Sequence, residues 1–324
     1  KDFLSRDKEA MQTQFIGITQ EFESFGKLEL KEAILRTDTL ILEYELEDLR
    51  IELYRQSALI GANIAFIQES IKFLEQKRAN VERAQEFFAQ SLALKESFAK
   101  EMELQKALFS IDDKLLSLQD ALSQERNRCS AIAPDLACEN IAIEPSYETK
   151  ESITETPKYK IFALKSKLLT LKSDLEERKK FSNITATLSY NQRQKFEDYL
   201  FVSASFALPL YGSEEARAEA FNLQERENTD LERQYLQNAS ASYESGMKRI
   251  AILKERMEKL TALEQKYAQF TRYEEQSIAK AVTLAKSLEN QNLLIDLHLQ
   301  KLQYAFELTK TKLELFSLTQ ASLL

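Results

Sequence analysis

The stretch 200–212 (LFVSASFALPLYG) has the two-residue hydrophobic period of a β-strand. Small residues occupy one face of it, and the other face carries the apolar residues Val202, Ala204, Phe206 and Leu208. Pro209 and Gly212 end the strand and mark the turn into a helix. A tilted strand needs about 9–11 residues to cross a lipid bilayer, so this stretch is long enough to do so.

Two further stretches, 15–25 and 183–191, alternate in the same way. The apolar side chains that share a face in these two stretches are Ile16, Ile18, Phe22, Leu188 and Tyr190. The polar segment 192–198 links the second stretch to the strand at residue 200, which predicts a β-hairpin.

Residues 28–85 have the 3.5-residue period of a coiled coil. The heptad positions step by four and three residues, through Leu42, Leu46, Leu49, Leu53, Gln56, Ile60, Ile64, Ile67, Ile71 and Leu74. A second amphipathic run covers residues 94–122. A tight turn near 87–93 predicts a helical hairpin with legs roughly 95 Å long, and the alternative is an uninterrupted helix through Ser91.

The chain contains two copies of this plan, separated by 186 residues. At that offset Phe25-Gly26 aligns with Tyr211-Gly212, and the segment 90–93 (QSLA) aligns with 276–279 (QSIA). We therefore expect a first repeat over 1–128 and a second repeat over 157–324, with a second tip turn near 273–279. The intervening 129–156 is predicted to be an irregular insert, since the chain's prolines concentrate at and around it.

Composition narrows the function classes. Glycine (5) and proline (4) are scarce in 324 residues, as in a mainly helical chain. The net charge is −8, and Lys and Arg are spread along the helices, which argues against nucleic acid. The sequence contains no run of about 18 apolar residues, which a membrane-spanning helix would need. His298 is the one histidine, and without a His/Cys cluster or a glycine-rich phosphate loop we expect no catalytic, cofactor or metal site.

Three segments together resemble the TolC-like outer membrane factor family: the strand, PLYG turn and helix start at 200–212, ITQEFESFGK at 18–27, and RYEEQSIAKA at 272–281. The resemblance extends over nearly the whole chain from Phe15. Within the family, Gln20-Glu21-Phe22 with Gly26-Lys27 is most similar to the heavy-metal efflux branch of CusC- and CzcC-like proteins.

The resemblance implies a mainly α fold with a small β part: two β-hairpins and two long antiparallel coiled-coil hairpins per chain. It further implies a homotrimer with a shared 12-stranded β-barrel in the bacterial outer membrane and an α-helical tunnel across the periplasm. The implied function is the exit duct of a tripartite efflux pump, without enzymatic activity, in contact with outer-membrane lipid, a periplasmic adaptor protein and an inner-membrane transporter. A type I secretion exit duct and a soluble coiled-coil scaffold are the alternatives.

The resemblance also assigns candidate residues. The tip turns that would contact the adaptor comprise Phe88, Gln90, Ser91, Leu92, Ala93, Arg272, Tyr273, Glu275, Gln276, Ser277, Ile278 and Ala279. Glu274 and Glu275 would supply acidity at the tunnel entrance. Gly26, Pro209 and Gly212 would form the strand-to-helix turns, and the apolar strand residues named above would face the membrane. Cys129 and Cys138 would pair in an oxidising periplasm, or remain two unpaired thiols.

Overall fold

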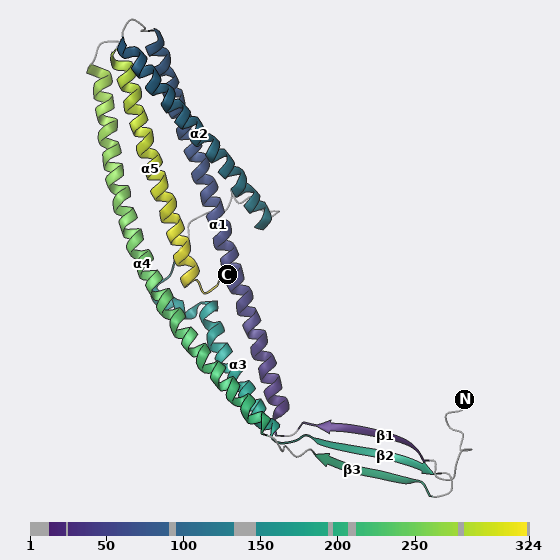
Figure 1. Ribbon diagram of the computed structural model, residues 1–324. Coiled ribbons are helices and arrows are strands. Elements are labelled where there is room, and N and C mark those ends of the chain that lie inside the picture. The colour runs from purple at the N-terminus through teal and green to yellow at the C-terminus, as the bar shows by residue number, and fades with distance from the viewer. Residues whose placement is uncertain are drawn as a thin grey trace, which may run out of the picture. The chain divides into compact units, whose positions relative to one another are not determined.

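The computed structural model describes residues 13–23, 25–90, 95–132, 147–193, 197–206, 212–277 and 282–322 (Figure 1). The elements are β1 (Thr13–Phe22), α1 (Lys27–Gln90), α2 (Lys95–Ile132), the 3₁₀ helix η2 (Lys150–Glu155), α3 (Pro157–Lys179), β2 (Ile184–Arg193), β3 (Tyr199–Phe206), α4 (Ser213–Ser277) and α5 (Val282–Thr319). The described chain is therefore mainly helical with a small sheet, as the sequence predicts.

The chain forms two compact units. The first comprises Lys1–Leu46 with Lys158–Tyr235, and the second comprises Glu47–Pro157 with Leu236–Leu324. The described strands and α3 belong to the first unit, while α2 and α5 belong to the second, and α1 and α4 each contribute residues to both.

The first unit carries an antiparallel sheet in the order β1-β2-β3. Ile18 lies opposite Leu188, which in turn lies opposite Val202, and this register continues along the strands. The predicted hairpin is confirmed as β2–β3. Beside the sheet, Ile41 of α1 packs with Ile161 and Leu168 of α3.

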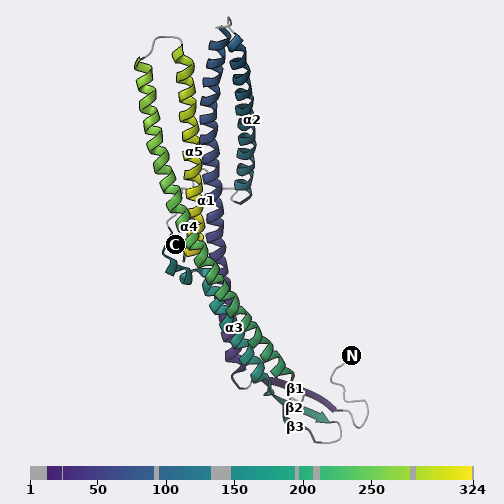
Figure 2. The same cartoon turned by 60° about the vertical axis from the view of Figure 1, so that its left-hand side comes forward.

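The helices of the second unit lie in the order α4, α5, α1, α2 (Figure 2). Between α1 and α2, Leu74 and Val81 pack against Ile111 and Leu115. Between α4 and α5, the amine of Lys301 lies 3.0 Å from the carboxylate of Glu264.

Contacts between α1 and α5 follow one antiparallel register. In order along α1, the contacting pairs are Tyr54–Phe316, Phe66–Phe306, Phe73–His298, Lys77–Asp296 and Asn80–Asn292. Three ring contacts are followed by an ion pair of 2.6 Å and an amide–amide hydrogen bond of 3.2 Å. As the residue number increases along α1, the residue number of its partner on α5 decreases by a similar amount.

The first tip turn separates two helices that run back alongside each other. The guanidinium of Arg78 on α1 lies 2.7 Å from the carboxylate of Asp112 on α2. One continuous helix would hold these residues roughly 50 Å apart, so the uninterrupted alternative is wrong.

Two predicted boundaries shift. The insert was expected to be irregular from residue 129, yet α2 continues to Ile132, because Pro134 is the first residue that opposes a helix there. The turn expected at 192–198 begins later, since β2 extends through Arg193. There the carboxylate of Asp198 accepts hydrogen bonds from the backbone N–H of Arg193 at 2.9 Å and from the hydroxyl of Tyr190 at 2.6 Å.

The 186-residue offset is present in the helices. α1 begins at Lys27 and α4 at Ser213, and their lengths are 64 and 65 residues. The residue before each helix is a glycine in the left-handed region, with φ of 69° at Gly26 and 60° at Gly212. The division of the chain into two repeats and an insert stays a prediction.

None of the described helices has the apolar length that a membrane crossing requires.

The two glycines differ in their surroundings, which gives a matched test. A Cβ at Gly26 would clash with the Arg178 guanidinium, which donates to the Phe25 carbonyl at 2.7 Å, whereas a Cβ at Gly212 meets nothing within 4 Å. Both Gly26→Ala and Gly212→Ala should cost about 1–2 kcal/mol through positive φ. Gly26→Ala should cost at least about 1 kcal/mol more, because it displaces a charged donor.

The measurement is the free energy of unfolding of both variants, followed by circular dichroism. Equal losses for the two variants would show that the Arg178 contact contributes nothing.

Candidate functional site

The sheet presents one face of exposed apolar side chains. This face is formed by alternate residues of the three strands, namely Ile16, Ile18, Phe22, Ile184, Leu188, Tyr190, Leu200, Val202 and Phe206. All the predicted membrane-facing strand residues that the structure describes lie on it, Ala204 included, while Leu208 falls outside the described residues. Large contiguous apolar surfaces of this kind mark contact with a protein or with lipid.

The opposite face of the sheet is lined mainly by hydroxyl groups. Thr19 and Thr187 lie across from each other with their hydroxyl oxygens 3.2 Å apart, and Ser203 follows on β3. Glu21 and Arg193 are the two charged side chains on this face among the paired residues of the described strands. A sheet with one apolar and one hydroxyl face suits a boundary between hydrocarbon and water.

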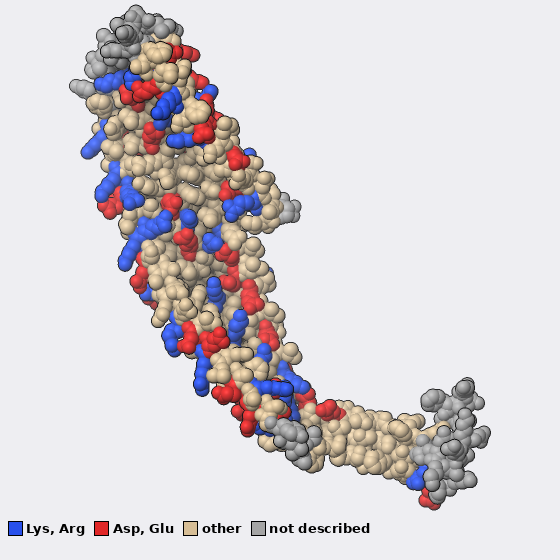
Figure 3. Space-filling model, in the orientation of Figure 1, with Lys and Arg blue, Asp and Glu red and all other residues tan. Residues whose placement is uncertain are grey.

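Charged side chains are concentrated away from the sheet. Figure 3 shows Lys, Arg, Asp and Glu spread over the helices with both signs mixed, while the visible surface of the strands is almost free of them.

Aromatic residues divide between the two sheet faces. The register places Tyr190 on the apolar face and Tyr199 and Phe201 on the hydroxyl face. Phe15 shares the hydroxyl face with Tyr199 and Phe201.

The junction between β1 and α1 is braced by the chain that leads from α3 into β2. Phe25 adopts a φ of 61°, a left-handed value that is uncommon for a residue with a side chain. Its carbonyl accepts the hydrogen bond from Arg178, and its ring packs on Phe181 with centroids 4.7 Å apart.

Lys27 is the buried charge of this junction. Its side chain is 5% exposed, and its amine donates to the carbonyl of Phe181 and, at 2.8 Å, to the side-chain oxygen of Asn183. The Asn183 amide in turn donates to Glu21 at 2.7 Å. Burial lowers the pKa of Lys27, and the carboxylates of Glu23 and Glu21 oppose that shift.

Sequence reasoning missed Lys27 and Asn183 as a pair. A lysine at the first position of a helix was the available signal, because the helix dipole disfavours a cation there.

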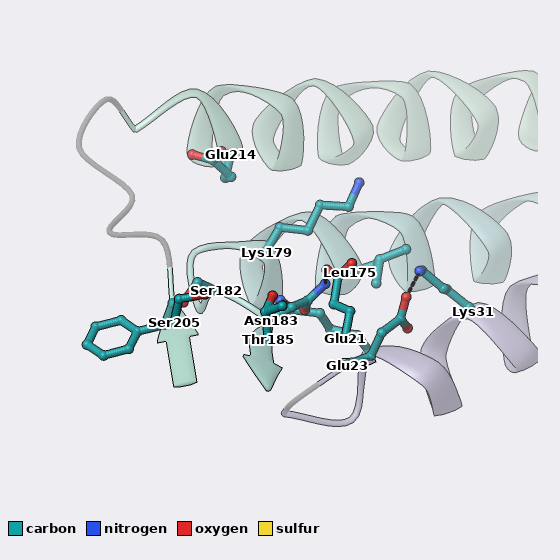
Figure 4. A pocket seen from close by; sticks show the side chains of 12 residues that line it. Glu21, Glu23, Lys31, Leu175, Lys179, Ser182, Asn183, Thr185, Ser205 and Glu214 are labelled. Carbon is teal, nitrogen blue, oxygen red and sulfur yellow. Dashed lines mark hydrogen bonds and ion pairs between the residues drawn. The ribbon is translucent and has the colours of Figure 1, made fainter. Parts of the chain in front are cut away.

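A cavity of about 680 Å³ opens beside this junction, between the hydroxyl face and the helix ends. Its wall carries three carboxylates, three amines, and uncharged polar and apolar side chains. The lining residues are Glu21, Glu23, Lys27, Lys31, Leu175, Lys179, Ser182, Asn183, Thr185, Ser205, Phe206 and Glu214. Figure 4 shows Glu23 and Lys31 paired across it, with Glu21 beside Asn183. The opposite charges balance, so the cavity has no net preference for either sign of ion.

The predicted tip residues lie at the ends of long helices. Phe88 and Gln90 belong to the last turn of α1, and 272–277 belong to the end of α4, including the candidate entrance residues Glu274 and Glu275. Both ends lie at the same end of the second unit (Figures 1 and 2). Ser91, Leu92, Ala93, Ile278 and Ala279 fall outside the described residues, as do Pro209 of the strand-to-helix turn and Cys138.

Cys129 is disulfide-bonded and buried against Ile60 and Ile64 of α1. Its pairing with Cys138 stays a prediction. His298 lies with its Nδ1 2.7 Å from the Leu294 carbonyl and its Nε2 3.0 Å from the Glu264 carboxylate. In the described part of the chain, no three His, Cys, Asp or Glu side chains gather as metal ligands would.

No family model and no curated protein matches the sequence, but solved structures do match the fold. CusC, whose crystal structures concern folding and transmembrane channel formation, matches with a TM-score of 0.75 at 13% identity, over 96% of this chain and 78% of CusC. The open-state MtrE outer membrane channel of Neisseria gonorrhoeae matches with a TM-score of 0.77 at 11% identity, over 96% and 81%. The CmeC outer membrane channel of Campylobacter jejuni matches with a TM-score of 0.69 at 12% identity, over 97% and 79%. The chain therefore has the TolC-like fold that the sequence predicts.

Removing the buried amine tests the junction. Lys27→Met leaves the Phe181 carbonyl and the Asn183 side-chain oxygen without this donor, and should lower the free energy of unfolding by about 1–3 kcal/mol at neutral pH.

The pH dependence has a definite sign. Because the pKa of Lys27 is lower in the folded chain than the unfolded value of about 10.4, the unfolded chain binds more protons between the two values. The stability of the wild type relative to Lys27→Met should therefore rise as pH increases toward 10.4. Denaturation of both proteins from pH 7 to pH 10 measures this, and a constant or falling difference would contradict it.

Proposed function

We propose that this chain is one subunit of a trimeric channel in the bacterial outer membrane, which serves as the exit duct of a tripartite efflux pump. The observation that carries the proposal is the sheet, whose exposed apolar face lies opposite a hydroxyl face. The apolar face suits lipid and the hydroxyl face suits a water-filled passage. The likeness of the fold to solved outer membrane channels supports the same conclusion.

Assembly of several copies follows from the edges of the sheet. Among the described strands, β1 and β3 each pair on one side, and unpaired edges invite further strands. Three strands are also far fewer than the eight or so of the smallest membrane barrels. A trimer that shares one barrel satisfies both demands.

A stripe on α1 supports contact between copies. Leu28, Leu35 and Leu42 recur every seven residues, and each is about two-thirds exposed in the single chain. Such a stripe is the seam of a coiled coil and requires an apolar partner.

The partners would meet the channel at the helix ends. The ends of α1 and α4, with the turns that follow them, are proposed to contact a periplasmic adaptor and an inner-membrane transporter. The heavy-metal branch is a finer proposal, since it rests on Glu21, Lys27 and their neighbours. These residues build the junction between β1 and α1. They therefore have a structural role in this chain and do not identify the cargo.

A soluble coiled-coil scaffold explains the heptads but leaves the apolar sheet face unexplained. A type I secretion duct would use the same surfaces, and no described residue favours it.

Mass and conductance test the proposal. The protein extracted from membranes should require detergent, should have three times the mass of one subunit, and should conduct ions in planar bilayers. An elongated monomer or dimer that is soluble in plain buffer would overturn the channel and favour the scaffold.

The leucine stripe gives a second test. The double variant Leu35→Glu, Leu42→Glu should weaken self-association at least about a hundredfold, because two apolar contacts per copy are lost. Sedimentation in detergent would then detect monomers. The control is Arg36→Glu, which changes an exposed charge on the same helix; equal behaviour of both variants would exclude the stripe as the interface.

A further inference from the structure

One of the two edge helices of the second unit, α2, carries an apolar stripe that no helix of the described chain covers (Figure 2). Ile111 and Leu115 of α2 pack on α1. Met102, Phe109 and Leu116 recur every seven residues on the side turned away from α1, and each is more than half exposed. A stripe with this period is the seam of a coiled coil and requires a second helix.

The other edge helix, α4, carries a stripe of the same period. Leu263 and Phe270 are seven residues apart, and each is at least 40% exposed. Position 264 faces α5, since the Glu264 carboxylate pairs with Lys301, and positions 263 and 270 are turned from it by about 100° and 120°. Two helices separate α4 from α2 in the same unit, so one copy cannot join its two stripes to each other.

The charges beside the two stripes have opposite signs. On α2, Asp113 lies four residues after Phe109, and on α4, Lys266 lies four residues before Phe270, so each charge is about 40° to the side of a ring. Both side chains are exposed, and neither makes an ion pair within the part of the chain that the structure describes. An exposed carboxylate and an exposed amine therefore accompany the two apolar stripes.

The same arrangement recurs one heptad further from the tip. Asp120 lies four residues after Leu116, and Lys259 lies four residues before Leu263. Asp120 accepts a hydrogen bond of 2.8 Å from the side chain of the residue four positions on, and Lys259 pairs at 2.6 Å with the carboxylate four positions before it. Exposed contacts of this kind within one helix are worth little, so both groups can take a further partner.

Contacts inside the unit set the relative heights of α2 and α4. Asp112 of α2 pairs with Arg78 of α1, and the preceding residue of α1 pairs with Asp296 of α5. Two positions further along α5, His298 lies 3.0 Å from the Glu264 carboxylate of α4. Counting residue for residue along these antiparallel helices puts position 112 of α2 level with position 267 of α4.

We propose that α2 of each copy packs antiparallel against α4 of the next copy in this register. Copies in a ring stand at the same height, so the next copy presents its α4 at the level just derived. Apolar groups then meet apolar groups and acids meet bases, in the pairs Phe109–Phe270, Asp113–Lys266, Leu116–Leu263 and Asp120–Lys259.

A contact between two different edges is heterologous, and it closes when the copies form a ring. The inference rests on the proposed channel function, which supplies that ring. It adds a surface in the second unit, apart from the leucine stripe of α1, together with its residue register.

Disulfide cross-linking tests the register. Asp113→Cys combined with Lys266→Cys should give covalent trimers on non-reducing gels after oxidation with copper–phenanthroline, because a disulfide needs Cα atoms within about 7 Å. The two positions cannot meet within one copy, because α1 and α5 separate them and neighbouring helices lie about 8–10 Å apart. The matched control is Asp113→Cys with Lys259→Cys, which moves one cysteine by about 10.5 Å along the same face and should give little cross-linking.

Charge reversal gives a second readout. Lys266→Asp opposes Asp113 with a like charge and should weaken self-association in detergent about fivefold, the effect of one exposed ion pair. Adding Asp113→Lys should restore the wild-type value, because the pair is then present with its signs exchanged. Sedimentation in detergent measures all three proteins, and a double variant as weak as the single one would contradict the pairing.

The outcomes separate this interface from the channel itself. A wild-type trimer whose 113–266 cysteine variant forms no cross-link, or forms fewer than the control, would overturn the α2–α4 register and leave the channel intact. A wild type that does not self-associate in detergent would overturn the channel proposal, and with it the premise of the interface.

Discussion

The apolar face of the three-stranded sheet is the surface that the rest of the structure has to accommodate. Water would meet large exposed side chains from Ile16 to Phe206, and the strand edges present backbone groups that require partners. The proposed channel would meet both demands, because several sheets would join edge to edge with their apolar faces in lipid. In the proposed channel, the hydroxyl ladder of Thr19 and Thr187 then faces the passage.

The change from sheet to helix is held by polar contacts together with the ring contact of Phe25 and Phe181. Lys27 donates to the backbone carbonyl of Phe181 and to the side-chain oxygen of Asn183. Arg178 donates to the backbone carbonyl of Phe25. Such bonds fix direction more strictly than apolar packing does. The second strand-to-helix turn, at Gly212, has an open surrounding instead, so the two repeats share a backbone conformation but not its support.

Local periodicity predicted what is local in the structure. The alternation of Ile16, Ile18, Leu188 and Val202 gave the strands and their common face, and the repeated offset predicted where α1 and α4 begin. The hydrogen bond between Lys27 and Asn183 joins residues 156 positions apart, and no periodicity in one chain reports such a distance. The insert was placed from residue 129 because the prolines concentrate at and around it, whereas α2 continues to Ile132, close to the first of them.

The antiparallel register of α1 and α5 has a mechanical consequence. The contacts from Tyr54 to Asn80 share one antiparallel register with α5. Sliding one helix along the other would therefore separate the ring contacts, the ion pair and the amide–amide hydrogen bond at the same moment. The seam between the two helical hairpins therefore resists shear as one unit. A rotation about the seam loses these contacts gradually, so pivoting is the motion that costs this part of the chain least.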